Sequence, residues 1–554
     1  MLFLILSRLF YLQVITGERL QEKAIDQWTR EIPVVAERGE FYDRNGKLIV
    51  SNYDAYTVYA RANAISDKET TAKILSESFS LDYQVFLNKL RKSSVSEITV
   101  ARQVSQETIN TILTNELKGV YYSRDNARYY EHGDFLSQVL GFTSVDGNGL
   151  TGLELYYNKY LKGQNGEILT ETDIIGKEIN GKNSYIPASD GLNVMLTIDF
   201  EIQLILEDVL SRAIEEHGAK TAEVIVVDPN TGEILGMCMK PSFNLNEIPR
   251  DNKDLLNALS RNVLITDVYE PGSTFKIITV AANIEEYLKG NSNAYSPSHI
   301  FNSSRYRYID GQKVKCWSDH KNGKHANLNI SGGLNNSCNP IFVDMAMSLG
   351  KEKMYEYITK FNFGKATGID FVGESQGMIL PVSSVQNVDL ARIGFGQTIA
   401  VTPIQLALAT AAVINGGNYY SPYLVKALYS SDNKLVERKM PILRNKVISK
   451  EASKILNEML MDVVVSGSGN KAYIEGYNVA GKTGTAQKYE NGVIASGKYV
   501  SSFIGYFPSN APKYLALVIV DEPKGQYYGS TVAAPYAREI FERIIEVKQI
   551  KPVS

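Results

Sequence analysis

The chain has 554 residues, of which 44% are apolar and 21% are charged, a composition typical of a folded protein with more than one domain. A net charge of −3 provides no attraction to nucleic acid, and the sequence has no phosphate-binding glycine loop, dinucleotide fingerprint or long basic run. We therefore expect neither a disordered chain nor a nucleic-acid-binding protein.

The N-terminal segment 1–15 is apolar but is interrupted by Arg8. A membrane-spanning helix needs about 20 apolar residues, and this segment is shorter. No small-residue cleavage site of a secretory signal follows it. The residues alone are consistent with an amphipathic surface helix, and a helical stalk is predicted after it, at 17–35.

The rest of the first half mixes strands and helices. Strands are expected from near Arg38, where Asn45 and Gly46 indicate a hairpin turn. The segment 66–118 carries helical patterns, and the segment 140–195 has a mixed α+β pattern with glycine-rich turns.

The second half opens with a strand at 194–198 and a helix at 200–217. The segment 223–236 has the pattern of a hairpin that turns at 229–232. Nearer the C-terminus, three segments have strand composition and predict an antiparallel meander: 480–487, 500–507 and 514–520. With a final helix at 533–547, these elements predict an α+β body.

Ser273 opens the first string with chemical meaning, S-T-F-K, in which Lys276 follows three residues later. The preceding proline and glycine and the apolar run after it suit a buried helix, so both side chains are expected on one face. A serine needs a nearby base to be a good nucleophile, and burial or neighbouring positive charge can keep a lysine neutral for that task. The same spacing is common by chance, so this string alone is weak.

Ser337 and Asn339 form a second string with Cys338 between them. They suit a proton relay between the lysines and a leaving amine, and a contact with a substrate amide. The neighbouring Asn335 and Asn336 suit caps and turns, so a helix N-cap is the alternative, and for this string alone it is the stronger one.

Lys482, Thr483, Gly484 and Thr485 lie in the first strand of the expected meander. Gly484 leaves room for a substrate backbone, and a peptide could add there as a further strand. The backbone N–H groups of Thr485 and Ser273 would form an oxyanion hole. The three strings in this order predict acyl transfer through a covalent serine ester.

A second group of residues has the spacing of metal ligands. Cys316, His320, His325 and Cys338 follow a C-x3-H-x4-H-x12-C pattern that suits tetrahedral zinc, and Asp319 is an alternative ligand to His320. Four protein ligands leave no open position for water, so this Zn²⁺ would be structural and the acyl-transfer chemistry would need no cofactor. A metal there would lock the second string in place.

Two other states of these thiols stay open. Cys316 and Cys338 are either reduced and unpaired or joined in a disulfide outside the cell. Cys238 lies in a strand-like segment and is expected in the core.

The chain resembles the class B penicillin-binding proteins, which are peptidoglycan D,D-transpeptidases, and most of all their division and sporulation branch, the FtsI/SpoVD type. The segments 269–276, 480–487, 38–46 and 149–154 carry the resemblance, with weaker matches at 128–130, 394–397, 527–529 and 533–535. These segments span nearly the whole chain.

The resemblance implies an α+β transpeptidase domain of the penicillin-binding and serine β-lactamase-like kind, with an antiparallel sheet packed against helices, on an elongated mixed α+β pedestal. The expected division is the C-terminal end of a membrane anchor at 1–16, the pedestal of the dimerisation type at 17–190, and the transpeptidase domain at 191–554. The anchor implies a cell-membrane protein with an extracytoplasmic catalytic domain.

The resemblance also implies the roles of the site residues. Ser273 is the nucleophile, Lys276 its base, and the second and third strings are the relay and the substrate edge, with Lys482 among the catalytic residues. Cysteine often stands at the position of Cys338 in this family without a metal. The expected partners are peptidoglycan stem peptides, β-lactam antibiotics, the membrane, a separate membrane glycosyltransferase, and division or sporulation proteins.

Two alternative functions remain at this point. A serine β-lactamase or β-lactam sensor shares the first and third strings, although such proteins need no pedestal. A non-catalytic scaffold at the division site would keep the fold and lose the chemistry of Ser273.

Overall fold

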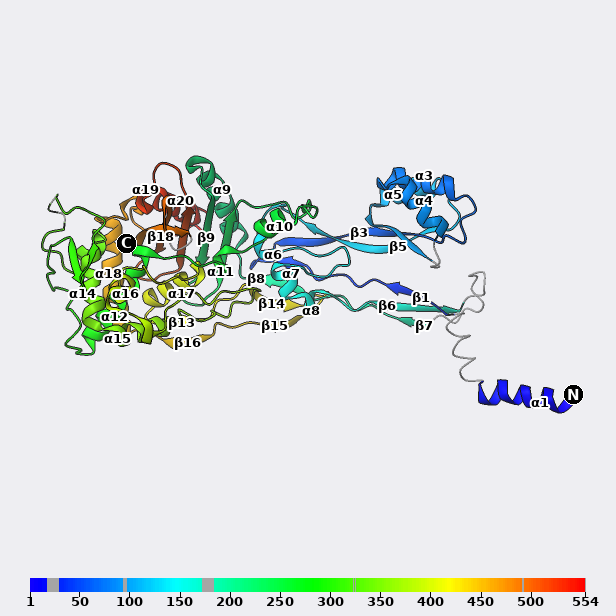
Figure 1. Cartoon of the computed structure of the whole chain (residues 1–554), viewed down its shortest axis with the longest axis horizontal. Helices are drawn as coiled ribbons and strands as arrows, with labels where there is room; N and C mark the ends of the chain where they lie inside the picture. The colour runs from blue at the N-terminus through cyan, green and yellow to red at the C-terminus, as the bar shows by residue number, and fades with distance from the viewer. Residues whose placement is uncertain are drawn as a thin grey trace.

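The computed structural model describes residues 1–16, 29–92, 97–171, 184–321, 323, 325–490 and 493–553. It has a thick body and an elongated arm that carries a small group of helices at its far end (Figure 1). The N-terminus lies beyond the arm, whereas the C-terminus lies in the body (Figure 1). The α+β fold and the elongated N-terminal pedestal are both confirmed.

A five-stranded antiparallel sheet forms the centre of the body, in the order β10-β9-β19-β18-β17. Its strands are β9 (Thr221–Val227), β10 (Ile234–Lys240), β17 (Ala480–Glu490), β18 (Val493–Phe507) and β19 (Tyr514–Asp521). The predicted hairpin is β9–β10 and the predicted meander is β17–β18–β19. The strand that carries the third string, β17, is an edge strand of this sheet.

Helices cover both faces of this sheet. The helices α9 (Phe200–His217) and α20 (Ala534–Val547) pack on one face, and α17 (Pro403–Ile414) and α18 (Lys450–Val465) pack on the opposite face. The helix α12 (Lys276–Leu288) packs against α17 and α18. Alternate strand residues point to the two sides, since Val224 belongs to the core under α9 and α20 while Ile225 belongs to the other core. Both predicted helices, 200–217 and 533–547, are confirmed within one residue.

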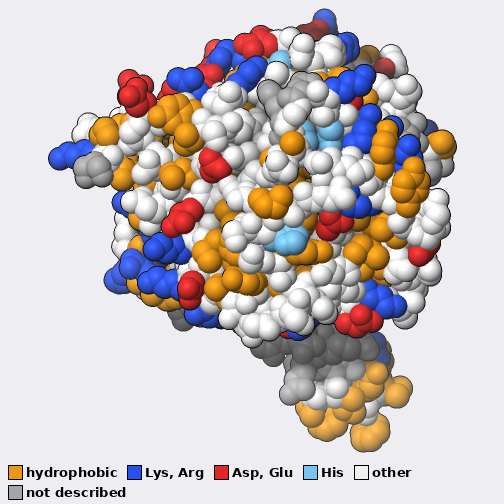
Figure 2. Space-filling model, turned by 90° about the vertical axis from the view of Figure 1, so that its left-hand side faces the viewer, with side chains coloured by type: hydrophobic (Ala, Val, Ile, Leu, Met, Phe, Trp, Pro, Cys, Tyr) orange, Lys and Arg blue, Asp and Glu red, His pale blue; other side chains and the backbone are white. Residues whose placement is uncertain are grey.

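Shorter elements complete the body. They are α10 (Lys253–Leu259), α11 (Val263–Thr266), α13 (Ile330–Asn335), α14 (Asn339–Leu349), α15 (Lys351–Lys360), α16 (Asn387–Ile393), α19 (Gly529–Val532), the 3-10 turns η2 (Gly272–Phe275), η3 (Val382–Ser384) and η4 (Asn470–Ala472), and the paired strands β11 (Tyr306–Ile309) with β12 (Gln312–Lys315) and β13 (Asn418–Tyr420) with β16 (Leu443–Lys446). The end of the body in Figure 2 carries basic and acidic side chains interspersed among hydrophobic ones, so neither charge sign dominates that face.

A seven-stranded sheet connects the body to the arm, in the order β15-β14-β8-β2-β3-β4, with β5 paired to β3. Its strands are β2 (Phe41–Tyr42), β3 (Leu48–Ala60), β4 (Ile98–Val104), β5 (Val120–Tyr130), β8 (Asn193–Leu196), β14 (Val425–Tyr429) and β15 (Leu435–Arg438). Two of these strands, β14 and β15, come from the second half of the chain. The arm therefore grows out of a sheet that both halves build.

The far end of the arm has its own small core. The helices α3 (Lys68–Phe79), α4 (Tyr83–Lys92) and α5 (Gln106–Leu113) bury apolar side chains against β3 and β4, as the helical patterns at 66–118 predict. A separate antiparallel sheet contains β1 (Thr29–Val34), β6 (Gly166–Glu171) and β7 (Ser184–Ile186). The helical stalk predicted for 17–35 is therefore wrong at 29–34, where pairing with β6 overrides local propensity; its residues 17–28 lie outside the described residues.

A buried ionic triad joins the two N-terminal segments that carry the family resemblance. Glu154, in α7 (Gly152–Tyr156), is fully buried and accepts hydrogen bonds of 2.7 Å from Arg38 Nε and from Arg128 Nε. The short helices α6 (Ser137–Leu140) and α8 (Asn158–Leu161) flank α7. The triad therefore fixes the base of the arm.

The N-terminal helix α1 (Leu2–Phe10) continues into the π-helical turn η1 (Tyr11–Ile15). Its large apolar side chains are exposed, including Phe3 at 81% and Leu4 at 74%. Within the described part of the chain, no helix has the length and apolar character needed to cross a membrane.

Candidate active site and adjacent metal cluster

Ser273 lies in the 3-10 turn η2, which leads directly into the buried helix α12. Gly272 before it has a φ of +54°, a conformation that favours glycine, and its N–H donates to the carbonyl of Gly396. A Cβ on Gly396 would lie 2.0 Å from the carbonyl oxygen of Gly272, so the close approach of these two segments also requires glycine at position 396. The two glycines hold the turn that presents Ser273 at the end of the helix.

Lys276 places its ammonium group at the centre of the site. Its Nζ donates to Ser273 Oγ at 3.0 Å, to Ser337 Oγ at 2.9 Å and to Asn339 Oδ1 at 2.7 Å. The side chain is completely buried, and this burial lowers the pKa of Lys276 to about 8 although the nearby sulfurs of Cys316 and Cys338 oppose the shift. A lysine with this pKa is partly neutral near physiological pH.

Ser337 connects the three strings. Its Oγ lies 2.9 Å from Ser273 Oγ and accepts a hydrogen bond of 3.1 Å from Lys482 Nζ. It sits between α13 and α14, and Cys338 occupies the N-cap position of α14 without a side-chain cap bond. The alternative of a simple N-cap for Ser337 is therefore wrong, because its hydroxyl faces the nucleophile and both lysines.

Lys482 is fully buried on the edge strand β17. Its Nζ donates to Ser337 Oγ and, at 3.0 Å, to the carbonyl of Thr483. Burial lowers the pKa of Lys482 well below its ordinary value, and the positive charge of Lys276 adds to this shift. Two buried ammonium groups around one hydroxyl repel each other. The pair therefore favours states in which at least one of the two lysines is a neutral amine.

Close packing inside the protein requires glycine at position 484. A Cβ there would lie 2.4 Å from Ser502 Oγ and 3.0 Å from Thr274 Cγ2. Packing within the protein therefore requires glycine here, and the approach of a substrate backbone to this residue stays a prediction. Gly484 lets β17 approach η2, and Thr485 Oγ1 next to it accepts the N–H of Gly529 at 3.0 Å.

Comparison with known proteins agrees with this geometry. Residues 222–542 match the penicillin binding protein transpeptidase domain, and residues 33–196 match the penicillin-binding protein dimerisation domain. Stage V sporulation protein D of Bacillus subtilis is 38% identical over 99% of this chain and 84% of its own length. This chain is a class B penicillin-binding protein of the FtsI/SpoVD type. Such a protein is a cell-wall transpeptidase, and the predicted enzyme class is confirmed.

More distant relatives share the fold. Peptidoglycan D,D-transpeptidase FtsI of Escherichia coli is 28% identical over 99% of this chain and 90% of its own. Penicillin binding protein 2X of Streptococcus thermophilus has a TM-score of 0.74 at 24% identity, over 94% of this chain and 80% of that one. Penicillin binding protein 3 of Mycobacterium tuberculosis, complexed with aztreonam, has a TM-score of 0.72 at 22% identity, over 94% of this chain and 98% of that one.

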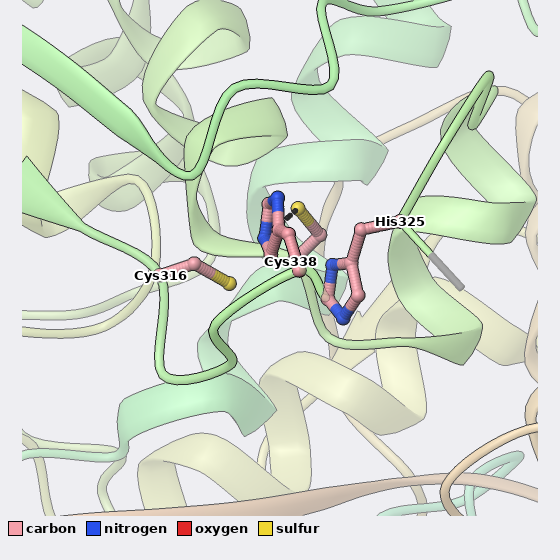
Figure 3. A group of neighbouring side chains, drawn as sticks. Cys316, His325 and Cys338 are labelled. Atoms are coloured by element: carbon pink, nitrogen blue, oxygen red, sulfur yellow. Dashed lines mark hydrogen bonds between the residues drawn. The ribbon is translucent and has the colours of Figure 1, made fainter. Parts of the chain in front are cut away.

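Beside the active site, this penicillin-binding protein gathers a Cys/His cluster, formed by Cys316, His320, His325 and Cys338. The side chains of Cys316, His325 and Cys338 point toward one another (Figure 3), and one possible ligand atom from each of the four residues lies within 4.8 Å of all the others. All three cysteines of the chain are free thiols. Asp319, the alternative ligand, lies outside the cluster among the described residues, and its carboxylate accepts the backbone N–H of Lys321.

The donor set of the Cys/His cluster fits a tetrahedral zinc ion. Ligand atoms around zinc are about 3.3–3.8 Å apart, so the observed spacing needs a contraction of at most about 1–1.5 Å. His320 Nδ1 bonds the Ser303 carbonyl at 2.8 Å, which leaves Nε2 available as a ligand. His325 Nδ1 is buried without a hydrogen-bond partner. Contact with the Cys338 thiol lowers the pKa of Cys316, so a thiolate ligand is favoured there.

Sequence reasoning missed two polar contacts of the site. Trp317 Nε1 donates to the carbonyl of Ser337 at 3.1 Å, and Ser468 Oγ lies 3.2 Å from Thr483 Oγ1. A tryptophan directly after a cysteine of the cluster was a visible signal, but its target is set by tertiary structure. Ser468 lies in an ordinary loop after α18, where nothing in the local sequence marks it.

Proposed function

We propose that transpeptidation in this enzyme proceeds through an ester on Ser273. The observation that carries this proposal is the 3.0 Å contact between Ser273 Oγ and the buried Lys276 Nζ, whose pKa is lowered to about 8. Neutral Lys276 takes the hydroxyl proton while Ser273 Oγ attacks the carbonyl carbon of the penultimate D-alanine of a stem peptide. The backbone N–H groups of Ser273 and Thr485 stabilise the oxyanion that forms.

The same groups complete the acylation and serve the second half-reaction. Ser337 lies between Lys276 and Lys482 and passes the proton to the nitrogen of the departing D-alanine as the C–N bond breaks. The amine of a second stem peptide then attacks the ester and returns the proton to Ser273. Asn339 holds a substrate amide, and the edge of β17 at 483–485 pairs with the peptide as an added strand.

A fluorescent penicillin tests this mechanism, because a β-lactam acylates the same serine that the stem peptide would. We expect one long-lived adduct, which peptide mapping by mass spectrometry places on Ser273, and no adduct in Ser273→Ala. Ser348→Ala is a matched control, since that serine of α14 bonds the carbonyl of Asn293. An adduct at another residue overturns the assignment, rapid release of the penicilloate indicates a β-lactamase, and unchanged cross-linking by Ser273→Ala indicates a scaffold.

We propose the following division of the chain and its place in the cell. Residues 1–16 are the C-terminal end of a membrane anchor, residues 17–190 a pedestal and residues 191–554 an extracytoplasmic transpeptidase domain. The exposed apolar side chains of α1 support the anchor, and the two family matches support the other parts. Flotation with phospholipid vesicles tests the anchor: the double variant Phe3→Asp and Leu6→Asp should lose binding, and no binding by the unaltered chain contradicts it.

We propose that the enzyme acts in septal or spore cell-wall synthesis with a separate membrane glycosyltransferase and with division or sporulation proteins. The names of its relatives, a stage V sporulation protein and FtsI proteins, support this setting. Cross-linking in living cells followed by mass spectrometry tests it, and recovery of no glycosyltransferase or division protein would contradict it.

We also propose that the Cys/His cluster binds a structural Zn²⁺. The buried His325 Nδ1 without a partner and the convergence of two sulfurs and two imidazoles support this. Elemental analysis of protein purified without chelator should find about one zinc per chain, and His325→Ala should lose it. His299→Ala is the control, because that imidazole contacts the ring of Tyr295 outside the cluster. Less than about 0.2 zinc per chain refutes the proposal, and a thiol titration then separates free thiols from a disulfide.

A further inference from the structure

Trp317 makes a hydrogen bond that the mechanism above does not use. Its indole Nε1–H lies 3.1 Å from the carbonyl oxygen of Ser337 and 3.2 Å from that of Asn336. The same Ser337 carbonyl accepts a second hydrogen bond, of 2.8 Å, from Lys276 Nζ. Donors from two distant segments of the chain, α12 and the loop after β12, therefore hold one carbonyl.

The conformation of Ser337 explains why this carbonyl needs to be held. Ser337 has a φ of +50°, in the left-handed region that residues with a side chain rarely adopt. Strained residues of this kind persist where the surrounding structure fixes them. This backbone conformation places Ser337 Oγ within hydrogen-bond distance of both Ser273 Oγ and Lys482 Nζ.

Burial does not account for Trp317. Its side chain is 59% exposed, and its ring centroid lies 6.3 Å from the rings of both His325 and Tyr528. A tryptophan that stays this exposed contributes little to the core. Its chain neighbour Cys316 is 1% exposed and belongs to the Cys/His cluster, so the backbone on one side of Trp317 is anchored.

We propose that Trp317 is a positioning residue for acylation: its indole N–H, together with Lys276, fixes the Ser337 carbonyl and so aligns the Ser337 hydroxyl with Ser273. This inference rests on the proposed function of Ser273. It assigns the effect of Trp317 to the N–H group and not to contact between its ring and the substrate.

Trp317→Phe separates these roles because it keeps an aromatic ring and removes the N–H. Stopped-flow acylation by a fluorescent penicillin gives the binding constant and the first-order acylation rate constant separately. Loss of one such hydrogen bond should lower the acylation rate constant roughly three- to tenfold and leave the binding constant within about twofold. An unchanged rate constant, or weaker binding with an unchanged rate constant, overturns the proposal.

A closer isostere of tryptophan tests whether the effect of Trp317→Phe comes from the smaller ring and not from the lost N–H group. The chain has two tryptophans, so a Trp28→Phe background allows benzothienylalanine to be incorporated at position 317 alone. This residue has the size of tryptophan but no N–H, and its rate constant should fall as in Trp317→Phe, whereas 7-azatryptophan, which keeps the N–H, should restore it. A full rate with benzothienylalanine refutes the role of the N–H. Absence of any adduct on Ser273 in the unaltered protein would instead refute the proposed function, so the two failures are distinguishable.

Discussion

The lowered pKa of Lys276 predicts a specific pH dependence of acylation. The neutral amine is the form that can accept the proton of Ser273, and acidification converts it to the ammonium form. Burial lowers the pKa of Lys276 from 10.5 to about 8, so the active form should be lost as the pH falls through 8. The prediction is therefore tested by measuring acylation while the pH is lowered from 9 to 6.

The size of the effect follows from the neutral fraction of Lys276. With a pKa of about 8, this fraction is roughly 1% at pH 6, 9% at pH 7, 50% at pH 8 and 91% at pH 9. The acylation rate constant should thus rise about tenfold from pH 6 to 7, about fivefold from pH 7 to 8, and less than about twofold from pH 8 to 9. An unshifted lysine would give about a tenfold rise across every one of these intervals.

The assay is stopped-flow acylation by a fluorescent penicillin at constant ionic strength, corrected for hydrolysis of the free β-lactam at each pH. The midpoint belongs to the coupled pair of Lys276 and Lys482, because each charge disfavours the other. Lys289→Met is the control, since this lysine lies at the exposed end of the same helix and pairs with Glu285. A tenfold rise that continues past pH 9 refutes the lowered pKa, and a flat profile refutes Lys276 as the base.

Three further predictions test the framework around the site. Glu154→Gln should cost about 3–5 kcal/mol of unfolding free energy in denaturant titrations, because it leaves two buried arginines unpaired, while the acylation rate of the folded protein should not change. Gly484→Ala should slow acylation, because the new Cβ meets Ser502 Oγ at 2.4 Å, and adding Ser502→Ala should restore part of the rate; equal rates in all three proteins contradict the close approach. Burial raises the pKa of Glu223 from 4.5 to about 7, so its ionisation in the unfolded chain costs stability progressively as the pH rises from 4.5 to 7; Glu223→Gln should therefore raise the unfolding free energy by up to about 3 kcal/mol at pH 8 and by much less at pH 5, and an equal gain at both values contradicts this.

Local patterns identified much of the body correctly. The hairpin β9–β10, the meander β17–β18–β19 and the helices α9 and α20 all have a hydrophobic period that one element alone determines. The contact between Ser273 and Lys276 was equally predictable, because three residues along a helix bring two side chains to one face.

Pairings between distant segments could not be predicted in this way. The strand β8 pairs with β14 more than 200 residues later in the sequence, as in Met195 opposite Ala427, and no property of either strand alone specifies that partner. The strand β1 shows the same limit, because its helix-like segment becomes a strand only through its pairing with β6.

The choice between Asp319 and His320 as a cluster member shows why the spacing of ligand types is insufficient. The two residues are adjacent in sequence, so a ligand spacing that fits one of them fits the other with a shift of one position. The backbone decides between them: His320 has a φ of +61°, and its Nε2 lies 3.8 Å from the Cys338 sulfur. Because Cys338 follows Ser337 directly in the chain, a metal ion bound to the Cys338 sulfur would also restrain the strained turn that positions the Ser337 hydroxyl. The Cys/His cluster and the acylation site therefore share one segment of backbone. Binding of a metal ion to the cluster should alter the acylation rate constant more than the affinity for the β-lactam.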